Sequence, residues 1–235
     1  MRYLFIILAS LSVIGCVSVQ SSEKYLQPSV KNISNNLVLN ADFETVWGNL
    51  IKNLSSQYFV INNISKESRL LNVSFTSDEP DKFIDCGSMY RSFKSSHYPD
   101  ASGTKIYSVA SNNVKFLTTV KAPPPPGGVI VLYESNPFYT LQVLKTTKLE
   151  GRTNIFVAPK GNKTEIRANT RYIFTNAARV RNLTLKIPVP SDSWSVSFNS
   201  NGTGTKNLLS TDGETIEVSC VSKGILEANI LKAAD

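Results

Sequence analysis

The chain has 235 residues, a formal net charge of +7 and 41% hydrophobic residues. This hydrophobic fraction is sufficient for a packed core, so it excludes a chain that is disordered throughout. After residue 14, no apolar run approaches the roughly 20 residues that a membrane-spanning helix requires. The positive charge favours anionic partners, unless it serves only the solubility of the protein.

The first residues have the pattern of an export signal. A basic second residue precedes a short apolar run at residues 3–14, which a glycine ends. A basic start, a short apolar region and a small residue at the cleavage point are typical of a secretory signal peptide. The sequence Val13-Ile14-Gly15-Cys16 resembles the lipobox of bacterial lipoproteins. The resemblance implies that Cys16 becomes the N-terminus and carries acyl chains such as palmitate.

The resemblance also implies where the protein resides. Residues 1–15 are then a removed signal peptide, and several acyl chains on Cys16 give stable membrane anchoring. Lipoproteins retained at the inner membrane generally carry Asp after the lipidated cysteine, whereas this chain has Val17. The implied location is therefore the outer membrane, with the protein facing the periplasm. The alternative is an ordinary signal peptide, cut between residues 15 and 22, with a cysteine there by chance.

The segment that follows the cysteine is polar. Residues 16–36 are rich in Ser and Asn. Because such a composition buries little surface, we expect a flexible tether between the membrane and a folded domain at residues 37–235.

A helix and a hairpin are predicted to open this domain. Apolar side chains recur at helical spacing and form one stripe, made of Phe43, Val46, Trp47, Leu50, Ile51 and Leu54. This stripe predicts an amphipathic helix, with Asn40 or Asp42 placed to cap its start. Apolar and polar residues then alternate at positions 71–75, which predicts a strand paired with another at residues 58–64.

The middle of the chain is expected to be irregular. Residues 76–104 are rich in polar and turn-forming residues, so we predict mostly loop, followed by a broken strand at residues 105–120. Four prolines and two glycines predict an extended loop at residues 122–128 inside a single domain. The same tract would also suit a boundary between two domains or a ligand for a proline-binding groove.

A later strand carries a series of arginines. At positions 164–174 the apolar residues fall on even positions, and the charged and amide residues fall on odd ones. Arg167 and Arg171 therefore share the polar face, with Arg179 and Arg181 farther along the chain. Because guanidinium groups match the geometry of carboxylates and phosphates, these four residues are the candidate contact with an anionic partner. A solvated strand face is the alternative.

The order of elements predicts the fold class. Further strands are expected at residues 193–199 and 214–221, and a short terminal helix at residues 223–232. The predicted fold is α+β: an antiparallel sheet with an N-terminal and a C-terminal helix on one face.

One stretch resembles a known family. The helix around Trp47 at residues 43–51, with residues 59–61 and 71–75, resembles the opening of the helix-grip domain of BamC-type (NlpB/DapX-like) outer-membrane lipoproteins. In that family a Trp-bearing helix precedes a hairpin and lies across an antiparallel sheet. The resemblance covers residues 37–76 and the lipobox, and it implies a helix-grip-like topology.

The cysteine count points to one disulfide. With Cys16 assigned to lipid, Cys86 and Cys220 remain, and an oxidising compartment favours their pairing. Two buried free thiols are the alternative. The spacing of the cysteines predicts no metal site.

No catalytic residue is predicted. His97 is the only histidine, and its polar, loop-like surroundings indicate a surface residue rather than part of a nucleophile–histidine pair. Several acidic residues cluster in sequence, namely Asp78, Glu79, Asp81 and Asp85, and we expect them to form a solvated loop. We therefore expect a protein that is not an enzyme and needs no cofactor.

The expected function is non-enzymatic. The first hypothesis is a lipid-anchored accessory or scaffold protein that binds envelope proteins, and nucleic acid is not an expected partner outside the cytoplasm. The second hypothesis is a periplasmic module that holds a small apolar or lipid ligand between helix and sheet, near Trp47.

Overall fold

The computed structural model describes residues 19–96, 98–121, 138–183, 185–210 and 213–235. Cys16 with the predicted signal peptide, His97 and the proline tract at residues 122–128 lie outside the described residues. The elements follow one another as β1 (Val19–Leu26), β2 (Asn36–Leu39), α1 (Phe43–Ser55), β3 (Val60–Ser65), β4 (Leu70–Ser77), the short 3-10 turn η1 (Pro80–Lys82), β5 (Ile84–Asp85), β6 (Ser88–Ser95), the 3-10 turn η2 (Pro99–Ala101), β7 (Gly103–Ser108), β8 (Val114–Lys121), β9 (Phe138–Lys160), β10 (Lys163–Asn182), β11 (Ile187–Asn199), β12 (Thr203–Leu209), β13 (Thr215–Ser222) and α2 (Ile225–Lys232).

The fold is predominantly antiparallel β-sheet, so the predicted α+β class is wrong. Both predicted helices form, but strands occupy far more of the described chain. The region at 76–104, predicted as mostly loop, contains β6 and the start of β7. Helix α1 has 13 residues, whereas the two central strands have 23 and 20, so the expected helix-grip-like topology is also wrong.

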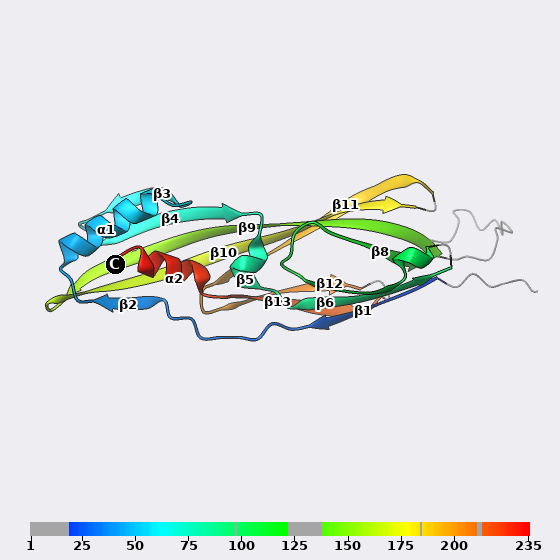
Figure 1. The fold of residues 1–235 in the computed structure, drawn as a ribbon, viewed down its shortest axis with the longest axis horizontal. Helices are drawn as coiled ribbons and strands as arrows, with labels where there is room; N and C mark the ends of the chain where they lie inside the picture. The colour runs from blue at the N-terminus through cyan, green and yellow to red at the C-terminus, as the bar shows by residue number, and fades with distance from the viewer. Residues whose placement is uncertain (1–18, 97, 122–137, 184, 211–212) are drawn as a thin grey trace, which may run out of the picture.

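A long hairpin of β9 and β10 organises the molecule. The two strands pair without interruption from Lys163↔Lys160 to Asn182↔Leu141. At about 3.3 Å per residue, β9 extends roughly 75 Å, and the molecule is correspondingly elongated (Figure 1). The sheet order is β11-β10-β9-β4-β3, with β2 added to β10 near the hairpin turn and β8 added to β9 at the far end.

The two helices cover one face of this sheet near the hairpin turn (Figure 1). Helix α1 begins where predicted, because the Asp42 carboxylate accepts a hydrogen bond from the Thr45 N–H at 3.0 Å. Its predicted apolar stripe is confirmed, since Val46, Trp47, Leu50 and Leu54 are all buried. Helix α2 packs against β10.

Two smaller sheets cover the same face at the other half of the molecule. Their strand orders are β1-β6-β7 and β12-β13-β5. Even-numbered residues of β10 point into the core along most of its length, as predicted for residues 164–174. The long sheet therefore has one continuous inner face and one solvated outer face.

The expected flexible tether is wrong for residues 19–26, which form strand β1 and pair with all of β6. Three inward side chains hold it: Ser21 bonds Thr119, Glu23 pairs with Arg91, and the Tyr25 hydroxyl accepts from the Ser219 N–H at 2.9 Å. Because these inward residues are mostly polar, hydrophobic periodicity does not reveal the strand.

The predicted pairing of Cys86 with Cys220 is confirmed. A disulfide joins them across 134 residues of sequence, and both cysteines are fully buried. It connects the end of β5 to β13, beside Tyr25, whose hydroxyl lies 3.1 Å from the Cys86 carbonyl oxygen. The bridge thus ties β1, β5 and β13 into one unit.

Candidate functional site

The four predicted arginines lie on one face but do not form one cluster. All occupy odd positions of β10, on its outer face. Arg167 and Arg181 are 14 residues apart, which corresponds to about 46 Å along a strand. Arg167 is bound by Glu165, whose carboxylate accepts from its Nε at 3.0 Å and Nη2 at 2.9 Å. Arg171 lies directly opposite Arg152 of β9.

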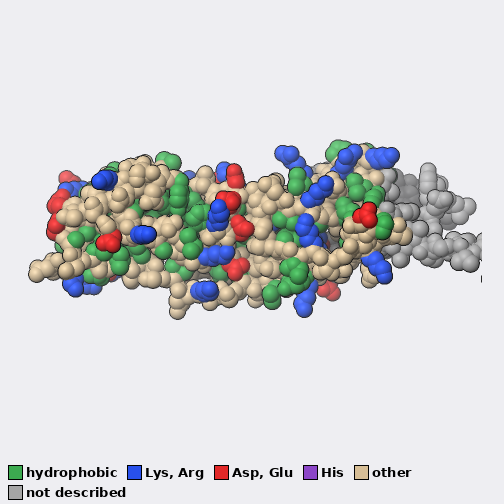
Figure 2. Space-filling view, in the orientation of Figure 1, with side chains coloured by type: hydrophobic (Ala, Val, Ile, Leu, Met, Phe, Trp, Pro, Cys, Tyr) green, Lys and Arg blue, Asp and Glu red, His purple; other side chains and the backbone are tan. Residues whose placement is uncertain are grey.

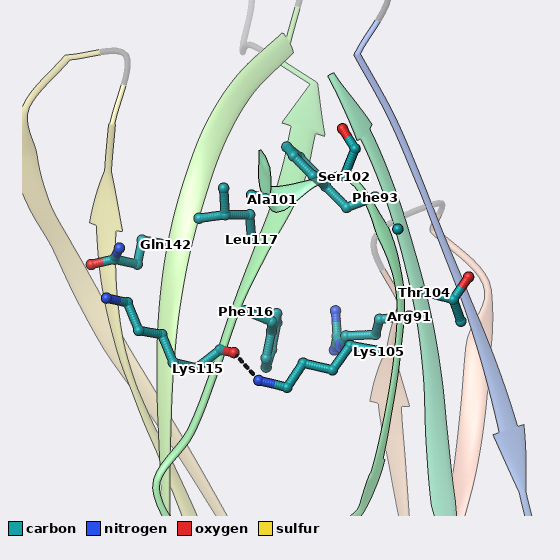
Figure 3. Close-up of a pocket in the computed structure, with 11 residues that line it drawn as sticks. Arg91, Phe93, Ala101, Ser102, Thr104, Lys105, Lys115, Phe116, Leu117 and Gln142 are labelled. Atoms are coloured by element: carbon teal, nitrogen blue, oxygen red, sulfur yellow. Dashed lines mark hydrogen bonds between the residues drawn. The ribbon is translucent and has the colours of Figure 1, made fainter. Parts of the chain in front are cut away.

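A hollow of about 440 Å³ lies between the edge strands β7 and β8, and we call it the seam (Figure 3). These strands belong to different sheets and do not pair with each other. The lining side chains come from β6, β7, β8, β9 and the end of η2, and they are Arg91, Phe93, Ala101, Ser102, Thr104, Lys105, Lys115, Phe116, Leu117 and Gln142.

The seam combines apolar surface with positive charge. Phe93, Phe116 and Leu117 supply its large apolar side chains. Arg91, Lys105 and Lys115 supply three cations, and no carboxylate is among the described residues that line it. Lys105 Nζ donates to the Lys115 carbonyl oxygen, which spans the gap between β7 and β8 (Figure 3). Figure 2 shows basic side chains gathered over this half of the molecule, with few acidic ones.

A second hollow of about 310 Å³, which we call the inner hollow, lies inside the sandwich. It shares Arg91 and Phe116 with the seam, so these two side chains form a common wall. Its lining mixes apolar side chains from both layers with several polar ones, including Glu23, Met89, Tyr107, Thr118, Val143, Lys145, Asn176, Trp194 and Leu208.

The common wall is held rigidly. Arg91 pairs with Glu23, and its Nε donates to the Tyr107 hydroxyl at 2.7 Å. Its guanidinium lies 4.2 Å from the centre of the Phe116 ring, which stacks on Tyr107 at 5.6 Å. Burial is the main cause that raises the pKa of Tyr107, so this hydroxyl stays protonated. Arg91 thus has a fixed position at the junction of the two hollows.

Lys145 is the unusual charge of the inner hollow. Its side chain is 5% exposed, and its Nζ donates to the carbonyl oxygens of Val109 at 2.6 Å and Ser111 at 2.8 Å. Burial lowers the pKa of this amine to about 7, the nearby charge of Asp81 opposes that shift, and Arg91 adds to it. Lys145 therefore titrates near neutral pH and binds the loop that joins β7 to β8.

Thr118 carries an unpartnered polar atom in the same hollow. Its side chain is 5% exposed, and its Oγ1 has no hydrogen-bond partner among the described residues. A buried hydroxyl without a partner costs free energy, because it has lost its bonds to water. Because Thr118 lines the inner hollow, its hydroxyl can form a hydrogen bond with a polar group that enters there.

Sequence reasoning missed both hollows, although one signal was present. Val143, Lys145, Thr147 and Leu149 lie on the same strand at alternate positions and are all buried. The alternation that places apolar neighbours inside also places a lysine inside, which is rare for that residue type. The partners that make a site around it come from β6, β7 and β11, and no local pattern indicates that they meet.

The other candidate residues do not form a site in the described part of the chain. Glu79 pairs with Lys82, and the Asp85 carboxylate accepts from the Gly87 N–H at 2.9 Å, so the acidic cluster has local structural roles. Trp47 is 5% exposed and stacks on Phe43, so it belongs to the packed core. No group of three metal-ligating side chains occurs among the described residues.

No family model, no curated protein and no solved structure matches this chain. Among the described residues, the helices are too short or too polar for a membrane span. The function must therefore be argued from the geometry and chemistry of the site.

Proposed function

We propose that the protein is a lipid-anchored envelope protein that binds an amphipathic anion in the seam and the inner hollow. The observation that carries this proposal is the pair of adjoining hollows, which have aromatic walls, together with the basic rim of the seam, whose described lining contains no carboxylate. Glu23, the carboxylate among the described residues of the inner hollow, is paired with Arg91. Each hollow lies within or near the size range of small-molecule sites, about 300–1,000 Å³.

The chemistry suggests which part of the ligand goes where. The apolar portion fits beside Phe116, Val143 and Trp194 of the inner hollow. The anionic group fits at the seam, where Lys105 and Lys115 are exposed to solvent and Arg91 is fixed by its partners. Charge-assisted hydrogen bonds to a carboxylate or phosphate are stronger than neutral ones. A fatty acid or a phosphorylated lipid therefore suits the site better than a neutral lipid.

The geometry also supports the proposed anchor at Cys16. Val19, where β1 starts, is three residues from Cys16, so at most about 11 Å of extended chain separates them. The start of β1 lies at the same end of the molecule as the turn between β10 and β11 (Figure 1). A chain of contacts connects the two through β8 and β9: Ser21 bonds Thr119, Thr119 pairs with Thr140, and the Thr140 carbonyl accepts from the Leu183 N–H.

That end of the molecule suits a membrane surface. Leu185 is 49% exposed and Ile187 is 50% exposed, and Lys186 lies between them (Figure 1 shows this end of β11). Exposed apolar side chains next to a lysine match the interface between acyl chains and anionic headgroups. Lipid at Cys16 would hold this end against the bilayer.

A fluorescence titration tests the proposed ligand. The Trp47→Phe variant keeps Trp194 as its single tryptophan, on the wall of the inner hollow. We expect laurate and dodecyl phosphate to shift its emission and dodecanol to have a much weaker effect, because only the first two carry an anion. We also expect Lys105→Gln with Lys115→Gln to weaken laurate binding several-fold.

Lys206→Gln is the matched control, because Lys206 is exposed on β12 and does not line either hollow. Equal binding of dodecanol and laurate would contradict the assigned role of the basic rim. The absence of any emission change with all three amphiphiles would refute the proposed binding function.

A second candidate function, an accessory or scaffold protein, is favoured by a separate surface. Val60 and Ile64 on the edge strand β3, with Leu70 on β4, are between 46% and 61% exposed. Edge strands with exposed apolar side chains are typical docking sites for another chain. Crosslinking of the natively lipidated protein in isolated membranes tests this role: a defined set of envelope proteins supports it, and a monomer without protein neighbours argues against it.

A further inference from the structure

The outer face of the long sheet carries a third hollow, of about 560 Å³, which we call the outer basin. It is separate from the ligand site proposed above, because Arg152, Asn154, Asn169 and Arg171 lie on the exposed outer face of the sheet. Its lining residues come from β9, β10, the end of β11 and the turn that follows it, and they are Arg152, Asn154, Asn169, Thr170, Arg171, Asn199, Ser200, Asn201 and Gly202.

Two arginines face each other across the basin. Arg152 and Arg171 are direct cross-strand partners, and both are exposed. Neither forms a salt bridge or hydrogen bond with a described residue, whereas Arg167 on the same face is bound by Glu165. Like charges directly opposite each other destabilise a sheet. An anion between them would remove that repulsion.

The amides of the basin add further donors. Asn154 accepts from Asn72 Nδ2 at 2.6 Å, and Asn169 accepts from Asn35 Nδ2 at 2.7 Å. In the same way, Asn201 accepts from the Ile33 N–H at 3.1 Å. All three amides thus use their oxygen within the protein, and among the described residues their NH₂ groups have no acceptor. The basin therefore presents donors to whatever enters it.

The wall of the basin is fixed by the core. Ser200 is 3% exposed; its Oγ donates to Glu227 at 2.7 Å and accepts from the Thr170 N–H at 2.7 Å. Glu227 is itself fully buried and bound by the Tyr172 hydroxyl at 2.8 Å. A turn held in this way is already ordered before a ligand binds, which lowers the entropic cost of binding.

We infer that the outer basin binds an anionic glycan through a carboxylate, phosphate or sulfate group. Two unpaired guanidinium groups supply the site for the anion. The row of amide donors suits the hydroxyl and ring oxygens that each sugar unit presents on several sides, whereas an acidic peptide adds only one backbone carbonyl per residue to its carboxylates. The lining contains no large apolar side chain, which distinguishes the basin from the seam.

Binding of defined oligosaccharides, measured by calorimetry at low salt, tests this inference. We expect oligogalacturonate or dextran sulfate oligomers to bind and neutral dextran not to bind. Comparison of the first two shows whether the basin prefers a carboxylate or a sulfate group. Arg152→Gln with Arg171→Gln should weaken binding roughly tenfold or more. Asn154→Ala with Asn169→Ala should weaken glycan binding several-fold and leave the binding of polyglutamate unchanged.

Arg179→Gln is the matched control, because Arg179 lies on the same face of β10 but outside the basin. All these residues are exposed, and thermal unfolding verifies that each variant is folded. The inference fails if neither acidic glycan binds, or if binding is indifferent to the Arg152 and Arg171 changes. It also fails if polyglutamate binds as tightly as the glycans and the asparagine changes have no effect, since the partner would then be an acidic protein.

Discussion

At the scale of single residues, Lys145 is the side chain whose behaviour depends most on its surroundings. A lysine that is 5% exposed lies on the wall of a hollow, with backbone carbonyls around its amine. These carbonyls stabilise the amine, and burial opposes its charge. The balance between burial and these hydrogen bonds sets the pKa of Lys145, and that pKa sets the contribution of this residue to the pH dependence of stability.

Because the pKa of Lys145 is lowered, we expect its contribution to stability to rise with pH above neutrality. Its pKa is about 7 in the folded protein, below its ordinary value of 10.5, so the unfolded chain binds more protons between these values. The free energy of unfolding therefore increases with pH in that window. From pH 7 to 9 we expect the wild type to gain up to about 2 kcal/mol over Lys145→Met, measured by urea unfolding. If the free energy of unfolding changed with pH in the same way in both proteins, the pKa of Lys145 would not be lowered in the folded state.

Gly151 is a position where a neighbouring side chain restricts which residue the fold accepts. The Phe75 ring lies directly over it, and a Cβ at Gly151 would lie 1.9 Å from Phe75 Cε1. Phe75 and Gly151 are cross-strand partners of β4 and β9. The glycine therefore leaves room for an aromatic ring that fills the core.

We expect Gly151→Ala to destabilise the protein by about 1–3 kcal/mol, because the ring must move out of a packed site. Phe75→Leu should remove much of this penalty in a double-mutant cycle measured by urea unfolding. Gly48→Ala is the control: Gly48 is exposed in the middle of α1 with no neighbour near its Cβ position, so alanine should stabilise by about 0.5–1 kcal/mol. Equal effects at both glycines would contradict the packing argument.

At the scale of elements, the sequence predicts those with a strong apolar pattern. Helix α1 follows from hydrophobic periodicity, and the two faces of β10 at residues 164–174 follow from alternation, because most of their inward residues are apolar. Strand β1 was missed because Ser21 and Glu23 point inward and are satisfied by partners far away in sequence. The fold class was wrong for the same reason, since polar inward residues hide strands.

The candidate site was less predictable than the elements. The disulfide follows from the number of cysteines and the expected compartment, and the outer position of the arginines follows from alternation along β10. The seam requires Arg91 and Phe116 to meet from different sheets, and no sequence pattern near either residue specifies that contact. The sequence does not predict Arg152 as a site residue, because it lies on β9 and meets Arg171 only through the pairing of β9 with β10.

At the scale of the molecule, the two ends differ in structure. Helices α1 and α2 and the C-terminus lie near the hairpin turn, and β8 and the start of β1 lie toward the other end (Figure 1). The seam and the inner hollow are lined in part by β8 and therefore belong to that second end. The disulfide lies between the two ends and joins segments 134 residues apart. It stabilises the folded chain by restricting the unfolded one.

We expect Cys86→Ala with Cys220→Ala to destabilise the protein by about 2–5 kcal/mol, measured by thermal and urea unfolding without reductant. Adding reductant to the wild type should reproduce the loss, and adding it to the double variant should have no effect. Mass spectrometry under non-reducing conditions gives an independent test, since two free thiols in the purified protein would contradict the disulfide.

The proposed amphipathic ligand has a defined place in the molecule, at the seam and the inner hollow. Photo-crosslinking with a fatty acid that carries a diazirine on its chain, followed by peptide mapping, measures it most directly. We expect crosslinks to residues of β8 and β9 that line the two hollows, around Phe116 and Val143, and we expect excess laurate to remove them. Crosslinks concentrated on α1 around Trp47, or spread over the whole surface without competition, would contradict the proposed place of the ligand.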